Sequence, residues 1–125
     1  MFGKKKEKIL RVMHYEGIES FATDYPCTLK IANDELIIKR TNPETTVTLP
    51  LSRIKSFSAM EEKNFMLQYH NQAITTSKAK GINKYYLVVK YDKGILAFWG
   101  GIKEYGEFIK LQQGNFITPP NHIEL

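Results

Sequence analysis

The chain has one cysteine, Cys27, and three histidines among its 125 residues. A single cysteine excludes an internal disulfide and leaves a thiolate metal site almost without ligands. The histidines, His14, His70 and His122, are far apart and form no His-x-x-x-His pair that could begin a metal site. We interpret His14 as a hydrogen-bonded surface or edge residue. We expect no metal, no cofactor and a reducing compartment.

Long apolar runs are also missing from the sequence. No run approaches the roughly 18 apolar residues of a membrane-spanning helix. The first six residues are basic enough for a signal peptide, but Lys8, Arg11 and His14 interrupt the stretch that would have to be continuously apolar. We therefore expect a cytoplasmic protein.

Catalytic signals are equally scarce. Cys27 starts an alternating strand whose apolar neighbours face the predicted core, which predicts a buried and unreactive thiol. The adjacent carboxylates Asp34-Glu35 and Glu61-Glu62 have no partner at catalytic spacing. Gly100-Gly101 lacks the lysine and serine of a phosphate-binding loop. The sequence therefore predicts a protein that is not an enzyme.

The sequence is rich in strand signals instead. Aromatic residues make up 12% of the chain, which favours sheet, and short alternating segments are separated by turn residues such as Asn33-Asp34 and Asp92-Lys93-Gly94. Apolar residues then recur at helical spacing over residues 102–113. The predicted strands cover residues 8–15, 27–31, 35–40, 45–49, 54–60, 85–91 and 95–99.

We expect one domain over residues 1–125, because a chain of this length buries a single core. Its core spans about residues 8–112, preceded by a basic segment, 1–7, and followed by a tail, 114–125. Residues 61–81 are interpreted as an insertion with a short helix and then a loop. The predicted core residues are Leu29, Ile31, Leu36, Ile38, Val47, Leu49, Ile54, Leu87, Val89, Ala97, Trp99, Tyr105 and Ile109.

Three motifs carry a family resemblance. They are Leu-x-Ile-x-Asn-Asp-x-Leu-x-Ile at 29–38, Val-Thr-Leu-Pro-Leu-Ser-Arg-Ile at 47–54, and Tyr-Tyr-Leu-Val-Val-Lys-Tyr at 85–91 leading into Ile-Leu-Ala-Phe-Trp-Gly. Together they resemble the bacterial pleckstrin-homology-like domains, which are related to the GRAM type, over about residues 8–112. The resemblance implies a barrel of about seven antiparallel strands closed by one C-terminal helix. It also implies a non-catalytic scaffold that binds proteins, lipids or copies of itself.

The strands at 85–91 and 95–99 are apolar on both faces, so one face needs cover from outside the barrel. We expect Tyr86, Val88, Leu96 and Phe98 to form an interaction surface for a protein partner or a second copy of the chain. The alternative is cover by the chain itself, either by the 61–81 insertion or by the tail with Phe116 and Ile117.

The net charge of +5 supports a second hypothesis, weak contact with anionic membrane surfaces. The loop at 16–26 contains acidic residues and no Lys or Arg, so a phosphate there would be repelled. Nucleic-acid binding is less favoured, because the aromatic residues cluster in the predicted core segments at 85–99. The candidate lysines are Lys4, Lys5, Lys6, Lys8, Lys78, Lys80 and Lys84.

Overall fold

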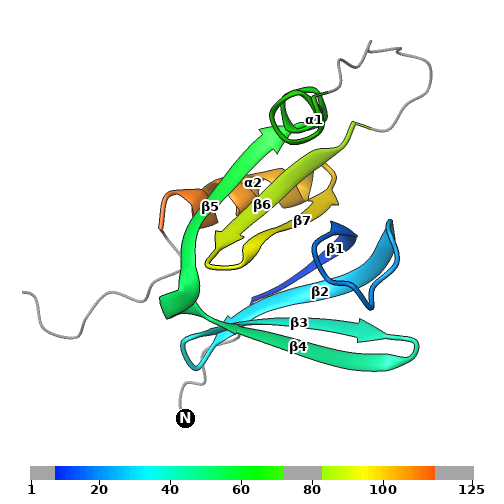
Figure 1. Ribbon diagram of the computed structural model, residues 1–125, viewed down its shortest axis with the longest axis vertical. Coiled ribbons are helices and arrows are strands. Elements are labelled where there is room, and N and C mark those ends of the chain that lie inside the picture. Colours follow the sequence, from blue (N-terminus) through cyan, green and yellow to red (C-terminus); the bar gives the residue numbers. More distant parts are fainter. Residues whose placement is uncertain (1–7, 72–82, 115–125) are drawn as a thin grey trace, which may run out of the picture.

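Seven antiparallel strands form one sheet in the computed structural model, which describes residues 8–71 and 83–114 (Figure 1). A short 3₁₀ turn, η1 (Leu51–Arg53), joins the fourth and fifth strands, and two α-helices complete the fold. The elements are β1 (Ile9–Glu16), β2 (Tyr25–Ala32), β3 (Glu35–Thr41), β4 (Glu44–Pro50), β5 (Ile54–Glu61), α1 (Glu62–His70), β6 (Tyr85–Tyr91), β7 (Gly94–Gly100) and α2 (Ile102–Gln112).

The sheet is open, which corrects the expectation of a closed barrel. Its strand order is β4-β3-β2-β1-β7-β6-β5, so β4 and β5 are the two edges, and no pairing joins them within the described residues. Pro50 ends β4, as expected from its missing amide donor, and β5 then runs away from β4 after η1 (Figure 1). A register shift between Ile54 and Ser56 bends β5 further.

The main core lies on the inner side of the sheet, where α2 packs against β1, β5, β6 and β7. Phe108 of α2 is fully buried there, whereas Ile102, at the start of the predicted helix face, is exposed. We call this group the inner cluster; it comprises Val12, Phe21, Cys27, Leu29, Leu36, Ile38, Leu49, Phe57, Leu87, Val89, Leu96, Phe98 and Phe108. Of the other predicted core residues, Ala97 is buried elsewhere, and Ile31, Val47, Ile54, Trp99, Tyr105 and Ile109 are partly buried.

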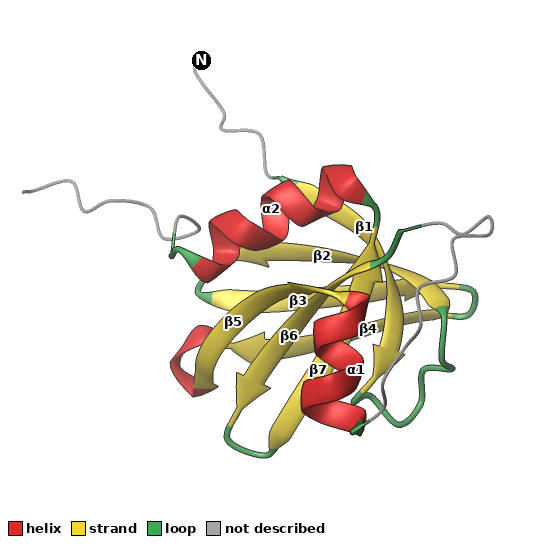
Figure 2. Cartoon of the chain, turned by 90° about the horizontal axis from the view of Figure 1, so that it is seen from above, coloured by secondary structure: helices red, strands yellow, loops and turns green. Residues whose placement is uncertain are grey.

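The insertion begins with the expected short helix, α1, while residues 72–82 lie outside the described residues. Helix α1 packs against β5 and β6 and covers a different part of the sheet from α2 (Figure 2). The ring of Phe65 stacks on that of Tyr86 with a centroid distance of 4.2 Å. This outer cluster comprises Met60, Phe65, Met66, Tyr86, Val88 and Ala97.

His14 is buried on the central strand β1, so its interpretation as a surface or edge residue was wrong. Its Nε2 accepts a hydrogen bond from the Ile18 amide at 3.1 Å, and its Nδ1 lies 3.0 Å from the Ala22 carbonyl oxygen. Because a carbonyl can only accept, Nδ1 carries the proton and the ring is neutral. Burial lowers the pKa of His14. The alternation of side chains along β1 could not reveal these two partners, because Ile18 and Ala22 lie in the loop that follows the strand and folds back onto His14.

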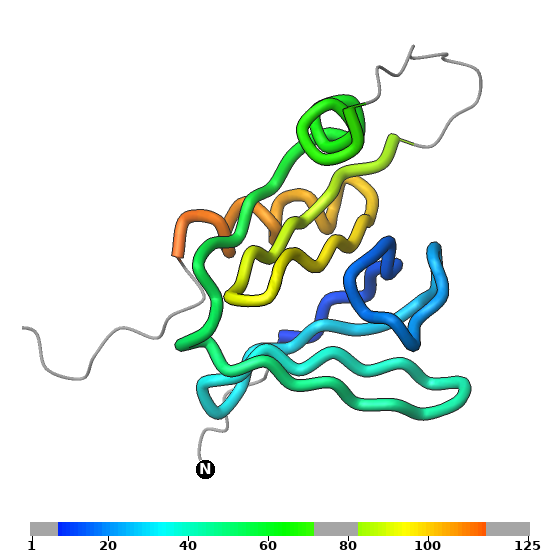
Figure 3. The backbone as a smooth tube through the Cα atoms, in the orientation of Figure 1, coloured from blue at the N-terminus to red at the C-terminus, as the bar shows by residue number. Residues whose placement is uncertain are grey.

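Arg40, on β3, also holds the loop at 17–24 in place. Its guanidinium donates to the carbonyl oxygens of Ser20 at 2.7 Å and Pro43 at 3.1 Å, and it lies 4.7 Å from the centre of the Phe21 ring. Phe21 in turn meets the His14 ring edge-on at 5.4 Å. The loop at 17–24 is thereby fixed beside the ends of β1 and β2 (Figure 3).

Candidate interaction surfaces

The four apolar residues predicted as an interaction surface lie on two different faces. In the β6–β7 hairpin Tyr86 pairs with Trp99 and Val88 with Ala97, whereas Leu96 pairs with Val89. Because directly opposite residues share a face, Tyr86 and Val88 point to the outer cluster, and Leu96 and Phe98 point to the inner cluster.

All four side chains are 4% exposed or less. Helix α1 covers Tyr86 and Val88, and the inner cluster encloses Leu96 and Phe98. The expectation of one accessible surface is therefore corrected: the chain covers its own hairpin, partly with the insertion that the alternative named.

The candidate lysines do not gather on one described patch. Lys4, Lys5, Lys6, Lys78 and Lys80 lie outside the described residues. Lys8 forms an ion pair with Glu107 at 3.2 Å, and the Lys84 ammonium lies 4.5 Å from the centre of the Trp99 ring. Within the described part of the chain, each of these two lysines thus has a partner of its own.

A shallow hollow of about 400 Å³ lies on the outer face where β7, β1, β2 and β3 run side by side, and we call it the outer-face groove. Met13 on β1 pairs with Trp99 on one side and Pro26 on the other, which makes an apolar row across three strands. Gly101, the residue before α2, and Glu104, in the first turn of α2, border the groove.

A basic row runs beside the apolar row in this groove. Thr28 on β2 pairs with Arg11 on β1 and Lys39 on β3, so the three side chains share the outer face. Arg11 and Lys39 are exposed, and neither forms an ion pair with any residue that the structure describes. The groove therefore joins apolar surface to two cations that have no ion-pair partner among residues 8–71 and 83–114.

The acidic groups near the groove are already engaged by N–H donors. The Glu104 carboxylate accepts the Gly101 amide at 2.9 Å, and the Asp24 carboxylate accepts the Trp99 indole N–H at 2.8 Å. The second contact, together with Lys84 over the ring, fixes the indole at the wall of the groove. Trp99 was expected in the core, and the structure leaves it partly buried among the residues that line the groove.

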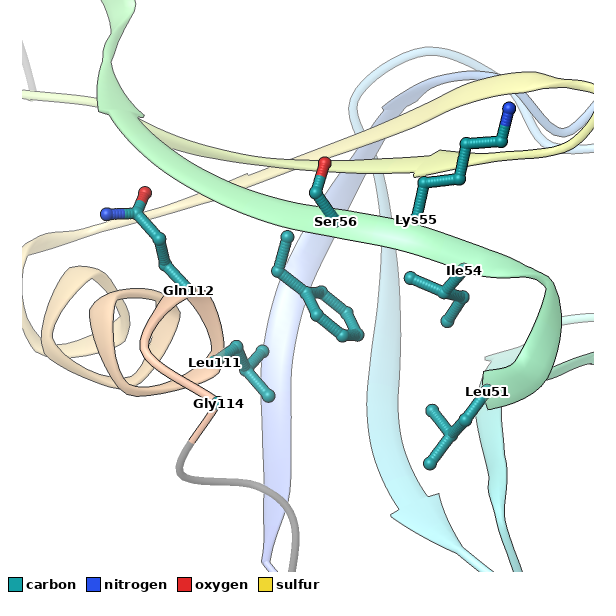
Figure 4. Close-up of a pocket in the computed structure, with 8 residues that line it drawn as sticks. Leu51, Ile54, Lys55, Ser56, Leu111, Gln112 and Gly114 are labelled. Carbon is teal, nitrogen blue, oxygen red and sulfur yellow. The ribbon is translucent and has the colours of Figure 1, made fainter.

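A second hollow of about 270 Å³ lies between β5 and the end of α2. Leu51, Ile54 and Leu111 reach toward it from three elements (Figure 4). The Gln112 side-chain oxygen accepts the amide of Ala59 at 2.7 Å and so ties α2 to the edge strand. The walls of this second hollow contain one basic side chain, Lys55, and no basic row beside an apolar row.

The described cysteine and histidine side chains that could be reactive are buried or paired within the fold. Cys27 is buried as expected, and burial raises the pKa of its thiol to about 12. His70 lies 3.0 Å from the Glu16 carboxylate and joins α1 to β1. Among residues 8–71 and 83–114, no three His, Cys, Asp or Glu side chains are grouped to hold a metal ion. No helix of the described residues is long and apolar enough to cross a membrane.

Comparisons of the chain with protein-family models, curated proteins and solved structures find no match. The fold is an open antiparallel sheet with a C-terminal helix and a short second helix.

Sequence reasoning passed over the groove residues Met13 and Pro26 as interaction candidates. The signal that could have found them is the pair of apolar residues, Met13 and Pro26, at outward positions of strands whose inward positions are already apolar.

Proposed function

We propose that this protein is a non-catalytic binding module of the pleckstrin-homology-like type that acts through protein–protein interaction at the outer-face groove. The observation that carries the proposal is the apolar row of Met13, Pro26 and Trp99 lying directly beside the basic row of Arg11 and Lys39. The order of strands and C-terminal helix supports the family part of the proposal.

The composition of the groove favours a protein ligand. Aromatic residues, methionine and arginine are enriched where proteins bind one another, and tryptophan and arginine are frequent among the residues that dominate binding energy. Trp99 is held by Asp24 and Lys84, so little side-chain freedom is lost when a ligand docks on it. The groove volume of about 400 Å³ suits a few side chains of a partner.

The test is affinity capture from the native cell extract with the full chain and two matched variants. Met13→Glu places a charge in the apolar row, and Leu67→Glu makes the same change at an exposed apolar residue of α1. We expect a protein retained by the wild type and Leu67→Glu at high salt but lost with Met13→Glu. Circular dichroism must show both variants folded.

Equal retention by the two variants would contradict the groove as the binding surface. The membrane alternative makes a different forecast, because contact through lysines disappears as salt screens the charges. Co-sedimentation with anionic vesicles that survives high salt and the loss of residues 1–6 fits neither account.

A further inference from the structure

We infer that the outer-face groove binds an extended acidic segment of a partner protein in which carboxylates alternate with large apolar side chains. This inference rests on the proposed function and specifies its ligand. It is carried by the juxtaposition of an apolar row and a basic row on neighbouring positions of the same three strands.

The charge of the ligand follows from which groups in the groove are still available. Arg11 and Lys39 have no carboxylate partner in the described part of the chain, while Asp24 and Glu104 each accept a protein N–H. Asp24 and Glu104 keep their negative charge, and Asp24 lies at Trp99 in the apolar row, so the ligand carboxylates belong on the basic row. There a carboxylate gains two cations without displacing an ion pair among the described residues. A basic segment would instead leave both cations unpaired and repelled.

The alternation of the ligand follows from the spacing of the two rows. Arg11 and Met13 are two residues apart on β1, so the rows are separated by roughly 7 Å. An extended segment lying between the rows, across the strands, sends successive side chains to opposite sides. Its carboxylates then meet Arg11 and Lys39, and its apolar side chains meet Met13, Pro26 and Trp99.

The two cations are far enough apart to engage separate carboxylates. Arg11 and Lys39 flank Thr28 on adjacent strands, which places their backbones roughly 10 Å apart. Carboxylates two residues apart in an extended segment are separated by roughly 7 Å, and the long side chains of Arg and Lys cover the difference.

Trp99 is the only tryptophan of the chain, so its fluorescence reports occupancy of the groove directly. The probe is a short capped peptide of alternating glutamate and leucine, titrated into the full chain, with glutamine and lysine versions of the same peptide as controls. We expect saturable binding of the acidic peptide that weakens but persists at high salt, because salt screens the two cations and not the apolar row. Both control peptides should bind at least about tenfold more weakly at low salt.

Arg11→Gln and Lys39→Gln should each weaken binding of the acidic peptide roughly fivefold. Lys90→Gln is the matched control, an exposed strand lysine on β6 outside the groove, and it should leave binding unchanged. Equal binding of acidic and glutamine peptides, or equal effects of all three substitutions, overturns the inference.

Two further results separate the failures. Anionic vesicles that shift Trp99 emission at physiological salt, with the shift lost in Arg11→Gln, would replace the peptide by a membrane headgroup and overturn the inference. If no acidic peptide binds but Met13→Glu still abolishes capture, the ligand chemistry is wrong and the proposed function stands. If neither effect is seen, both are wrong.

Discussion

Replacing Phe65 by alanine tests whether α1 seals the outer face of the β6–β7 hairpin. Phe65 is 0% exposed, stacks on Tyr86 at 4.2 Å and meets the Tyr15 ring edge-on at 5.6 Å. Truncating a buried phenylalanine costs about 3–5 kcal/mol, a range that includes the loss of its aromatic contacts and the cavity that remains. Domains are typically stable by about 5–15 kcal/mol, so the variant should still fold when the wild type is stable by more than about 5 kcal/mol.

Leu67→Ala is the matched control, because it makes the same change on the same helix at a side chain that is 50% exposed. Its effect should stay within about 0.5 kcal/mol, as is usual for surface positions. Urea unfolding followed by circular dichroism measures both variants, and the comparison holds if the denaturant slope is unchanged.

Loosening α1 also uncovers Tyr86 and Val88, the apolar residues that it shields. Phe65→Ala should therefore self-associate at high micromolar concentration, whereas the wild type and Leu67→Ala should not do so through this face. Size-exclusion chromatography with light scattering measures this. The reasoning would be refuted if Phe65→Ala lowered the free energy of unfolding by less than about 1 kcal/mol more than Leu67→Ala does.

Four more substitutions test local features of the structure. The lowered pKa of His14 means that the unfolded chain binds a proton more readily, so the free energy of unfolding should fall as pH drops below about 6.5 and stay flat above it. His14→Gln should flatten that slope in urea unfolding at several pH values. Gly17→Ala should destabilise the fold by about 2 kcal/mol or more, because φ is +115° and a Cβ would lie 2.5 Å from the Ile95 carbonyl oxygen; Gly106→Ala, with open space, should stabilise it by about 0.5–1 kcal/mol. Thermal melting compares the two glycine variants, and equal shifts would contradict the geometry. The Tyr86 hydroxyl is buried without a hydrogen-bond partner in the described structure, so Tyr86→Phe should be neutral or stabilising by about 1 kcal/mol in urea, and a clear loss would reveal a missed partner.

Local patterns predicted the elements well because the signals are local. Asn33 and Asp34 both have positive φ in the β2–β3 turn, and Gly94 takes φ of 145° after the β6–β7 turn. The predicted helix at 102–113 is α2, Ile102–Gln112. Side-chain period and turn chemistry are sufficient for these features.

Features that depend on which strands meet were not predictable in the same way. The open sheet follows from the path of the chain after Pro50, and the burial of His14 follows from a loop returning over β1. Neither leaves a periodic trace in the sequence. The two-residue turn of the hairpin pairs Tyr91 with Gly94, and this register alone decides which residues of β6 and β7 share a face.

The same register explains why Trp99 belongs to a candidate site and not to the inner core. The pairing from the turn places it opposite Tyr86 and therefore on the outer face, where α1 contacts Tyr86 on β6 and Tyr15 at the end of β1. Trp99 lies partly buried between the outer cluster and the groove. Its neighbour across the sheet is then Met13. An apolar residue facing outward is ordinary by itself. Three of them in register, beside two cations that form no ion pair with the described residues, make a surface that is apolar on one side and attracts carboxylates on the other. The burial of the predicted surface and the exposure of this one have the same cause, because α1 covers the hairpin and the end of β1 at Tyr15 and Glu16, while Arg11 and Met13 farther back on β1 line the groove.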